Sequence, residues 1–318
     1  MRVSSAEVIK KIKHAPFVIW MMLAIVGGLG VFVPSYFSVG NFTNVLVQSS
    51  PLLILAFGQT LIILTEGIDL SLGAQVSFVT VIWMFLATMG VDLYLAAAIA
   101  VCLAVLAGTV NGVLIAKGGL PPFIATLGVQ NVLNSISLLL TAGASIYYHT
   151  YTFQLISESM FLFLPLPVWI AYGMFAITWL LLYRTKFGTN IFGLGGNMEA
   201  LTFAGIDVSK AIIKTYAYAG LLAGIVGILV ACRVESGQPT IGNGWEFDTI
   251  AATILGGTSF REGKGGIVGT ILGVLLIYVI KNGLNVAGVN GLYQNAIIGS
   301  VVLTAIVVDT YLNKYRTD

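Results

Sequence analysis

Long apolar runs separated by short polar segments are the main pattern along this chain. Eight runs approach or exceed the length of a bilayer-spanning helix, which needs about 20 mostly apolar residues. They lie at about 16–34, 45–65, 72–90, 93–116, 123–142, 165–183, 211–232 and 292–309. Two shorter runs, at 249–260 and 266–280, are separated by F-R-E-G-K-G-G. The pattern predicts an all-α membrane protein, a polytopic bundle of about ten transmembrane segments with broken or short helices.

The composition agrees with a membrane protein. Of the 318 residues, 58% are hydrophobic and 9% are charged, whereas a soluble domain carries about 25% charged residues. The net charge of +2 is too small to favour a nucleic-acid partner. Cys102 and Cys232 lie in or at the end of different apolar runs, so they form neither a disulfide framework nor a metal-ligand pattern.

The lysines and arginines predict the orientation of the segments, because cytoplasmic loops carry the excess of these residues. With the N-terminus inside and ten alternating segments, only Arg233 and Lys281 of the 15 fall outside. The inside residues are Arg2, Lys10, Lys11, Lys13, Lys117, Arg184, Lys186, Lys210, Lys214, Arg261, Lys264, Lys314 and Arg316. We therefore expect both termini to be cytoplasmic.

The same count divides the chain into a cytoplasmic tail at 1–15, one transmembrane domain at 16–310 and a cytoplasmic tail at 311–318. A single span over 249–280 would place Arg261 and Lys264 at its centre. That placement costs roughly 2.5–3.5 kcal/mol for each residue, so we expect two short segments that meet at the inner surface.

Pairs of small residues four apart mark close helix contacts in membranes, because they let two backbones approach. Three such pairs occur in the apolar runs: Gly108 with Gly112, Gly220 with Gly224, and Gly269 with Gly273. We expect each pair to lie at a contact between helices.

The longest inside loop, at 184–210, contains a helix signal. Asn197 is a good N-cap, Glu199 places a negative charge in the first turn, and Gly205 suits the C′ position. A two-turn helix at 198–204 is unstable alone in water, so something must pack on it. Two interpretations stay open: a surface helix on its own membrane domain, or a docking element for a cytoplasmic partner.

No segment carries the signals of an enzyme. The G-K of F-R-E-G-K-G-G lacks the spacing of a phosphate loop. His14 and His149 are expected on opposite sides of the membrane and cannot share a metal, and no nucleophile–base pair is evident. The polar outside loop at 233–248 either receives a partner or polar substrate, or is a solvated loop.

The stretch T-E-G-I-D-L-S-L-G, residues 65–73, places two acids between two apolar runs. Either the span ends at Thr65 and the acids lie at the inner surface, or the helix breaks at Gly67 and restarts near Ser71. A broken helix is tolerated only when buried in protein or lining a cavity, and Gly-interrupted segments point to a transport pathway. Asp69 then caps the next span, contacts a solute, or serves as a gate or subunit contact.

These residues resemble a known family. T-E-G-I-D-L-S-L-G is similar to the G-G-I-D-L-S-V-G signature of bacterial sugar permeases of the ribose, xylose and galactoside type, which are membrane subunits of ATP-binding-cassette (ABC) importers. The resemblance continues through R-T-K-F-G-T-N-I-F-G-L-G-G-N-M-E-A-L-T-F-A-G-I, Q-P-T-I-G-N-G-W-E-F-D-T-I-A-A-T-I-L-G-G-T-S-F and G-K-G-G-I-V-G-T-I-L-G-V-L. It is strongest for ribose permeases. Glu66 replaces the usual first glycine, and Arg261–Glu262 replace a smaller, more neutral pair.

The resemblance implies the partners. An ATPase-coupling element lies in the inside loop, where the motif residues are Gly188, Gly195, Gly196, Asn197, Glu199 and Gly205. Two copies of an ABC ATPase domain carry ATP and Mg, so this chain needs no cofactor and hydrolyses nothing. A periplasmic or lipid-anchored substrate-binding protein delivers the solute. A second permease copy completes a homodimer or paired heterodimer in the bacterial inner membrane, with the pathway at or near the subunit interface.

The hypothesis from sequence is therefore a permease that moves a ribose-like monosaccharide inward by alternating access. Candidates for the pathway or gate are polar residues in or beside the spans: Gln59, Thr60, Glu66, Asp69, Ser71, Asn111, Asn134 and Asn282. One alternative is an ion-coupled secondary transporter that uses Glu66 and Asp69, because acids within a membrane are functional candidates. Others are a permease for a nucleoside or another small polar solute, and a docking scaffold.

Overall fold

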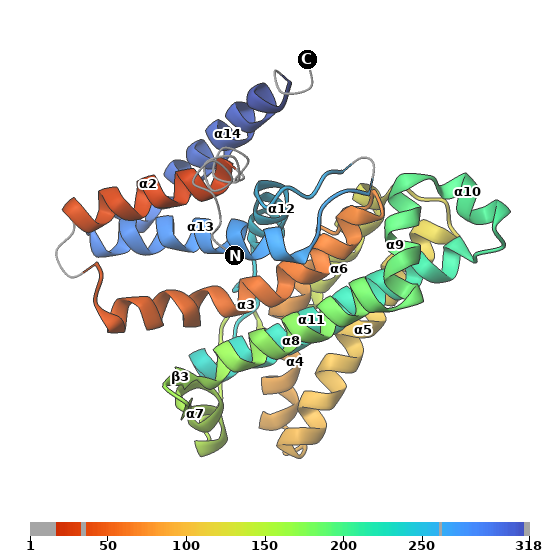
Figure 1. Ribbon diagram of the computed structural model, residues 1–318. Helices are drawn as coiled ribbons and strands as arrows, with labels where there is room; N and C mark the ends of the chain where they lie inside the picture. Colours follow the sequence, from red (N-terminus) through yellow and green to blue (C-terminus); the bar gives the residue numbers. More distant parts are fainter. Residues whose placement is uncertain (1–16, 33–35, 261–262, 315–318) are drawn as a thin grey trace.

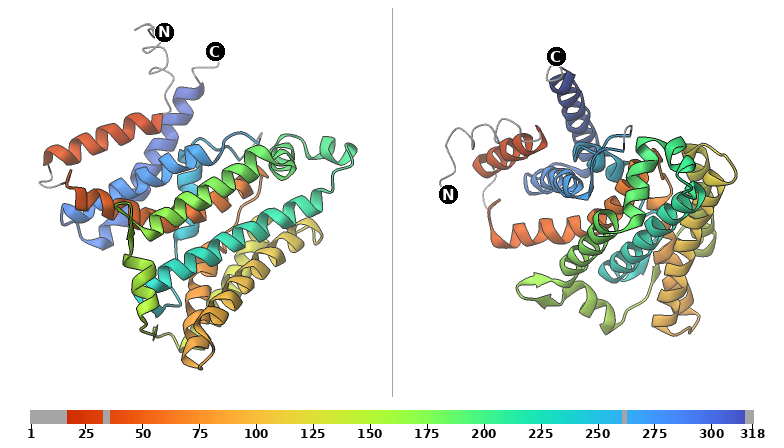
Figure 2. Two further views of the ribbon diagram at one scale, coloured as in Figure 1. Left: turned by 60° about the horizontal axis from the view of Figure 1, so that its bottom comes forward. Right: turned by 45° about the vertical axis from the view of Figure 1, so that its right-hand side comes forward.

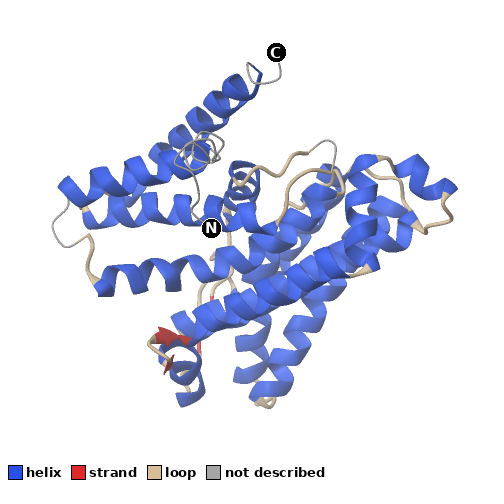
Figure 3. Ribbon diagram, in the orientation of Figure 1, coloured by secondary structure: helices blue, strands red, loops and turns tan. Residues whose placement is uncertain are grey.

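The computed structural model describes residues 17–32, 36–260 and 263–314, and helices dominate them (Figures 1 and 3). The tails at 1–15 and 315–318, with His14 and the pair Arg261–Glu262, lie outside the described residues. The helices are α2 (Phe17–Phe32), α3 (Val39–Leu64), α4 (Leu72–Thr88), α5 (Leu93–Ala116), α6 (Pro122–Thr141), α7 (Tyr151–Glu158), α8 (Leu166–Arg184), α9 (Lys186–Gly196), α10 (Met198–Phe203), α11 (Val208–Val234), α12 (Trp245–Leu255), α13 (Ile267–Val286) and α14 (Gly291–Lys314).

Each of the ten predicted runs coincides with a helix, but the helices differ in length. Within the described ranges, six are long and apolar enough to cross a membrane: α3, α5, α6, α8, α11 and α13. An all-α membrane protein is thereby confirmed. The 11 residues of α12 rise by only about 16 Å, about half of a bilayer core of about 30 Å, so α12 by itself is too short for the crossing expected at 249–260.

Helix α3 is the centre of the bundle, since 83% of its most apolar 18-residue stretch is buried inside the protein. One side of α3, including Phe57 and Leu61, packs on α8, α9 and α11. Its other side, with Leu52 and Ala56, packs on α12 and α13. In Figure 2, the long helices α8, α11 and α13 run beside α3, whereas α5 and α6 lie at the periphery.

The predicted small-residue pairs lie at helix contacts. A Cβ on Gly108 of α5 would collide with the Tyr216 carbonyl of α11 and lie 3.2 Å from the Cα of Gly220. Helices α12 and α13 meet in the same way, because Cβ atoms on Gly269 and Gly273 would collide with carbonyl groups of α12 and its C-cap. Glycine thus lets these backbones touch, as the sequence predicts.

Short strands close the end of the bundle opposite α9 and α10 (Figure 1). Strand β1 (Ile146–Tyr147) pairs antiparallel with β4 (Ser236–Gly237), and β2 (Met160–Phe161) pairs antiparallel with β3 (Leu164–Pro165). The pairing of β1 with β4 holds the segment that follows α11 against the loop that precedes α7.

The segment from Ser236 to Gly244 turns back into the bundle. The backbone N–H of Gln238 donates to Thr80 Oγ1 at 3.1 Å, and the N–H of Gly242 donates to Ser77 Oγ at 2.9 Å. A Cβ on Gly242 would collide with the Gly73 carbonyl. The segment therefore runs antiparallel to α4 for about 10 Å. The interpretation of 233–248 as a solvated loop is wrong for this part, because the segment is bonded to α4 and its Ser236, Gly237, Pro239 and Gly242 are buried.

The α5–α11 contact predicts the effect of adding one methyl group. Gly108→Ala forces the two backbones apart and should lower the free energy of unfolding by about 1–3 kcal/mol. Gly173→Ala on α8 is the matched control, because nothing lies within 4 Å of a Cβ there. Thermal unfolding of both variants in detergent measures the difference. Equal melting temperatures for the two variants would contradict the contact.

Candidate functional site

The chain leaves α3 through a tight C-terminal turn. The N–H of Glu66 donates to Ile63 O at 2.9 Å and the N–H of Gly67 donates to Ile62 O at 3.0 Å, which is the Schellman pattern. Glu66 occupies the C′ position with φ of 61°, where a residue without a Cβ is favoured. The glycine that the resemblance leads one to expect at this position fits this backbone.

Side chains from three other helices bind the segment between α3 and α4. The Tyr216 hydroxyl of α11 donates to Ile68 O at 3.2 Å. The N–H of Leu70 donates to Thr126 Oγ1 of α6 at 3.1 Å, and Asn111 of α5 donates to Ser71 Oγ at 2.8 Å. The segment around Asp69 is therefore buried in protein, as the second explanation predicts, with its polar groups satisfied by neighbouring helices. Helix α3 itself ends at Leu64 with Thr65 as its C-cap and Glu66 is exposed, as the first explanation expects.

Asp69 is fully buried and heavily hydrogen-bonded. Its Oδ1 accepts from the backbone N–H of Ser71 at 2.7 Å and from Ser71 Oγ at 2.6 Å. Asn111 Nδ2 lies 3.5 Å and 3.4 Å from the two carboxylate oxygens. Asp69 thus holds the chain at the start of α4. Glu66, in contrast, is exposed, so the two acids do not share one buried environment.

Polar acceptors beside this cluster lack protein partners. Asn111 and Gln75 both donate to Ser71 Oγ at 2.8 Å, whereas Asn111 Oδ1 and Gln75 Oε1 are buried and unpartnered. Buried polar atoms are normally hydrogen-bonded, so these two oxygens retain unused hydrogen-bonding capacity.

Glu246 is a buried acid that the sequence interpretation missed. It lies in the first turn of α12 with 3% of its surface exposed. Its Oε1 accepts from Gln130 Nε2 of α6 at 3.0 Å, and its Oε2 has no protein partner. A Cβ on Gly73 would collide with Oε2, so the carboxylate lies against the first turn of α4. Glu246 was missed from the sequence because 233–248 was assigned to an outside loop. The feature that could have indicated it is an acidic residue directly after G-N-G-W.

The other predicted pathway residues are dispersed. Thr60 Oγ1 lies 2.7 Å from Thr270 Oγ1 and joins α3 to α13. Asn282 exchanges amide hydrogen bonds with Asn41 at 2.8 and 3.0 Å. Gln59 is fully buried with both amide atoms unpartnered, and Asn134 has one buried unpartnered oxygen. Of the eight candidates, the structure joins Asp69, Ser71 and Asn111 directly.

The predicted helix in the long inside loop is present as α10. Asn197 Oδ1 accepts from the N–H of Ala200 at 2.9 Å, and Glu199 lies in the first turn. Gly205 has φ of 78° at C′. The N-cap and the C′ glycine are both confirmed. After α10, Asp207 caps α11, and its bond from the N–H of Lys210 holds the pKa of the Asp207 carboxyl below its usual range.

Helix α9 packs directly on the last turn of α3. A Cβ on Gly195 would collide with the Leu64 carbonyl and lie 2.8 Å from the Cα of Gly263. A Cβ on Gly188 would collide with the Leu182 carbonyl of α8. A Cβ on Gly196 would have no atom within 4 Å, so packing alone does not require a glycine there. Two of the motif glycines thus seat α9 against the membrane helices.

Helix α10 combines the two interpretations left open. Leu201 packs on α9, where a Cβ on Gly193 would lie 2.8 Å from its side chain. Phe203 is 90% exposed and Met198 is 43% exposed. The helix therefore rests on its own chain through one face and leaves an aromatic side chain uncovered on another.

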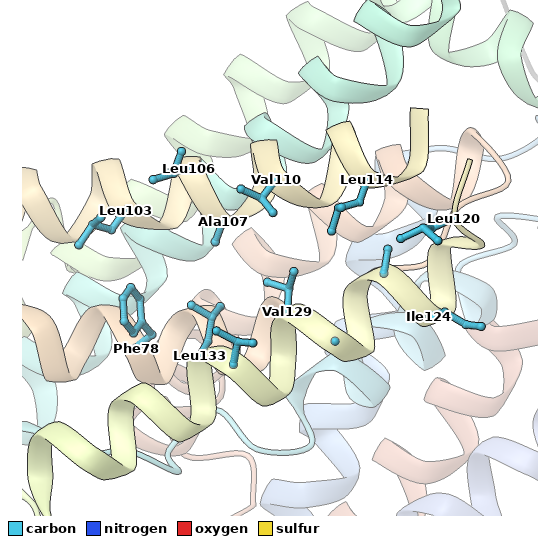
Figure 4. Close-up of a pocket in the computed structure, with 13 residues that line it drawn as sticks. Phe78, Leu103, Leu106, Ala107, Val110, Leu114, Leu120, Ile124, Val129 and Leu133 are labelled. Carbon is cyan, nitrogen blue, oxygen red and sulfur yellow. The ribbon is translucent and has the colours of Figure 1, made fainter. Parts of the chain in front are cut away.

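An apolar groove lies away from the polar cluster. It has a volume of about 520 Å³ and is lined by α5 and α6, with Phe78 of α4 at one end (Figure 4). Leu106, Val110, Val129 and Val132 are among its lining residues, so it offers few hydrogen bonds to a polar solute. No group of three His, Cys, Asp or Glu able to hold a metal occurs among the residues described.

The turn after α3 makes a prediction about Glu66. Glu66→Gly should raise the free energy of unfolding by about 1 kcal/mol, because it removes the Cβ from a left-handed residue. Glu66→Ala keeps that strain and is the control. Gly67→Ala should destabilise the protein, since its Cβ would lie 2.6 Å from the Tyr216 hydroxyl. Melting temperatures in detergent measure the stability of the three variants. A lower melting temperature for Glu66→Gly than for the wild type would refute the assignment of Glu66 to a strained left-handed position.

Comparison with known proteins agrees with the resemblance found in the sequence. Residues 41–306 match the family described as branched-chain amino acid transport system / permease component. The ribose import permease protein of Escherichia coli (strain K12) is 39% identical over 293 residues, which are 91% of this chain and 90% of the relative. That of Bacillus subtilis (strain 168) is 38% identical over 299 residues, which are 93% of this chain and 92% of the relative.

The D-allose transport system permease protein of Escherichia coli (strain K12) is 35% identical over 300 residues, which are 94% of this chain and 91% of the relative. No solved structure gives a significant match. The predicted resemblance to sugar permeases of the ribose type is confirmed. The chain is a multi-pass membrane protein that belongs to the family of branched-chain amino acid transport system permease components.

Proposed function

We propose that this chain is the permease subunit of an ABC importer that moves a ribose-like monosaccharide inward across the bacterial inner membrane. The observation that carries the proposal is the similarity to ribose import permeases over about nine-tenths of both chains. In the assembly we propose, two ABC ATPase domains bind ATP and Mg, and a binding protein delivers the sugar. A second permease copy completes a homodimer or paired heterodimer, and this chain performs no hydrolysis.

The proposed topology places the α9–α10 end in the cytoplasm, together with both termini. The single permease domain covers 16–310, the tails are 1–15 and 311–318, and α2, α4, α12 and α14 complete the ten segments. The support is the charge at this end, where cytoplasmic loops carry the Lys/Arg excess. The described basic residues there are Lys117, Arg184, Lys186, Lys210, Lys214 and Lys264.

Coupling would run from α10 through α9 to the helix break. The exposed Phe203 supplies an apolar anchor for an ATPase surface. Because Gly195 leaves no space between α9 and the Leu64 carbonyl, a displacement of α9 pushes on the last turn of α3. The chain then passes through Gly67 to Asp69, so the same displacement moves the start of α4. This contact is how ATPase closure would open or close the pathway by alternating access.

The polar cluster suits a neutral polyol. A sugar presents hydroxyl donors, and Asn111 Oδ1 and Gln75 Oε1 are acceptors without protein partners. Ser71 and Asp69 fix the positions of these amides through their shared hydrogen bonds. We assign Gln59 and Asn134 to the pathway on the same ground. Thr60 and Asn282 instead serve helix contacts, because their side chains are bonded to neighbouring helices.

Reconstitution into sealed vesicles tests the proposal. With ATPase subunits and the loaded binding protein, the wild-type chain should accumulate D-ribose only when ATP is hydrolysed. An imposed proton or sodium gradient should have no effect, and Glu66→Gly should transport normally. Gradient-driven uptake without an ATPase would instead establish the ion-coupled alternative. ATP-driven uptake of a nucleoside but not of ribose would move the assignment to a different solute.

The coupling surface makes a separate prediction. Phe203→Ala should weaken association with the ATPase about tenfold, the loss typical of truncating an aromatic anchor. Phe163→Ala is the matched control, because Phe163 is 92% exposed beside the β2–β3 pair at the other end of the bundle. Titration of purified ATPase against each permease variant measures the affinity. In a separate uptake assay, replacing Glu199 or Gly205 should uncouple ATP hydrolysis from sugar uptake. Equal ATPase affinities for both Phe variants would remove Phe203 from the interface.

A further inference from the structure

The N-terminal ends of two interrupted helices meet inside the bundle. Helix α4 begins at Leu72 after the break, and α12 begins at Trp245 after the segment that turns back along α4. Gly73 and Gly242 make the contact, since a Cβ on either would collide with the other helix's entering backbone. Discontinuous helices that meet in this way are the places where transporters expose polar groups to a solute.

Glu246 lies where these two helix starts meet, and one of its two carboxylate oxygens has no hydrogen-bond partner. Oε1 accepts from Gln130 Nε2 at 3.0 Å and from the N–H of Gly244 at 3.3 Å. Oε2 is buried and unpartnered, although burying a charged oxygen without a hydrogen bond is costly. Asp69 differs, because its Oδ1 is already occupied by two bonds from Ser71.

The free atoms in this region are of one chemical kind. Glu246 Oε2, Gln75 Oε1 and Asn111 Oδ1 are all acceptors, and all three side chains are at least nine-tenths buried. Ser71 Oγ fixes the two amides by accepting from both of their nitrogens. The matching ligand is rich in donors and small enough for a site between helices. Vicinal hydroxyl groups of a monosaccharide meet both conditions, and a carboxylate is the strongest acceptor for them.

We propose that Glu246 Oε2 is a hydroxyl-binding group in the sugar pathway. Gln130 is a positioning residue, because it donates to Oε1 and so restrains the orientation of the carboxylate. The inference rests on the proposed import of a monosaccharide. It adds a site within the permease that distinguishes sugars by their hydroxyl groups after the binding protein has released them.

The test compares two sugars in vesicles that contain the complete importer. Both D-ribose and 2-deoxy-D-ribose are supplied at concentrations that saturate the binding protein, so that selection by that protein does not set the rate. The wild type should move ribose about tenfold faster than the deoxy sugar, the loss expected for one bond to a charged acceptor. Glu246→Gln should reduce this ratio to within about twofold.

Asp92→Asn is the matched control, because it neutralises an exposed helix N-cap with a residue that caps equally well. It should keep the wild-type ratio. Gln130→Leu, which frees the carboxylate without removing it, should lower ribose transport and preserve part of the ratio. An unchanged ratio in Glu246→Gln, or a wild type that transports both sugars equally, overturns the inference but not the proposed function. A wild type with no ATP-driven uptake of either sugar removes the proposed function itself.

Discussion

Backbone polar groups within a bilayer find no water, so an interrupted helix must obtain its hydrogen bonds from protein. The break between α3 and α4 satisfies this constraint with side chains from α5, α6 and α11. Tyr216 donates to Ile68, Thr126 accepts from Leu70, and Asn111 donates to Ser71. These bonds tie α5, α6 and α11 to the segment between α3 and α4, and the positions of the remaining polar groups depend on them.

Close backbone contact is the second condition for this arrangement. Glycines place α5 against α11, α9 against the end of α3, and the start of α4 against the segment entering α12. In lipid there is little hydrophobic drive between helices, so such contacts provide much of the packing energy. Because the interior is close-packed, a shift of α9 at Gly195 is passed to α3 rather than absorbed by empty space.

The three acids near the break have three environments and therefore three uses. Glu66 is exposed at a helix end. Asp69 is buried and bonded within its own turn. Glu246 is buried with one oxygen unpartnered. Charge alone gives no reason to distinguish them, since all three are carboxylates beside apolar runs. Burial and hydrogen bonding distinguish a helix end at the first and a bonded turn before α4 at the second, whereas the solute contact of the third is our proposal.

The sequence alone determined the local features of this protein. The apolar runs located the helices, Asn197 and Gly205 bounded α10, and the Gly108 and Gly220 pairs marked a contact, because each depends only on nearby residues. Only the tertiary structure decided that the segment before α12 re-enters the bundle, since its N–H groups donate to Thr80 and Ser77 of a distant helix. That return placed Glu246 beside α4, a position that no local pattern records because it depends on residues more than 150 positions apart along the chain.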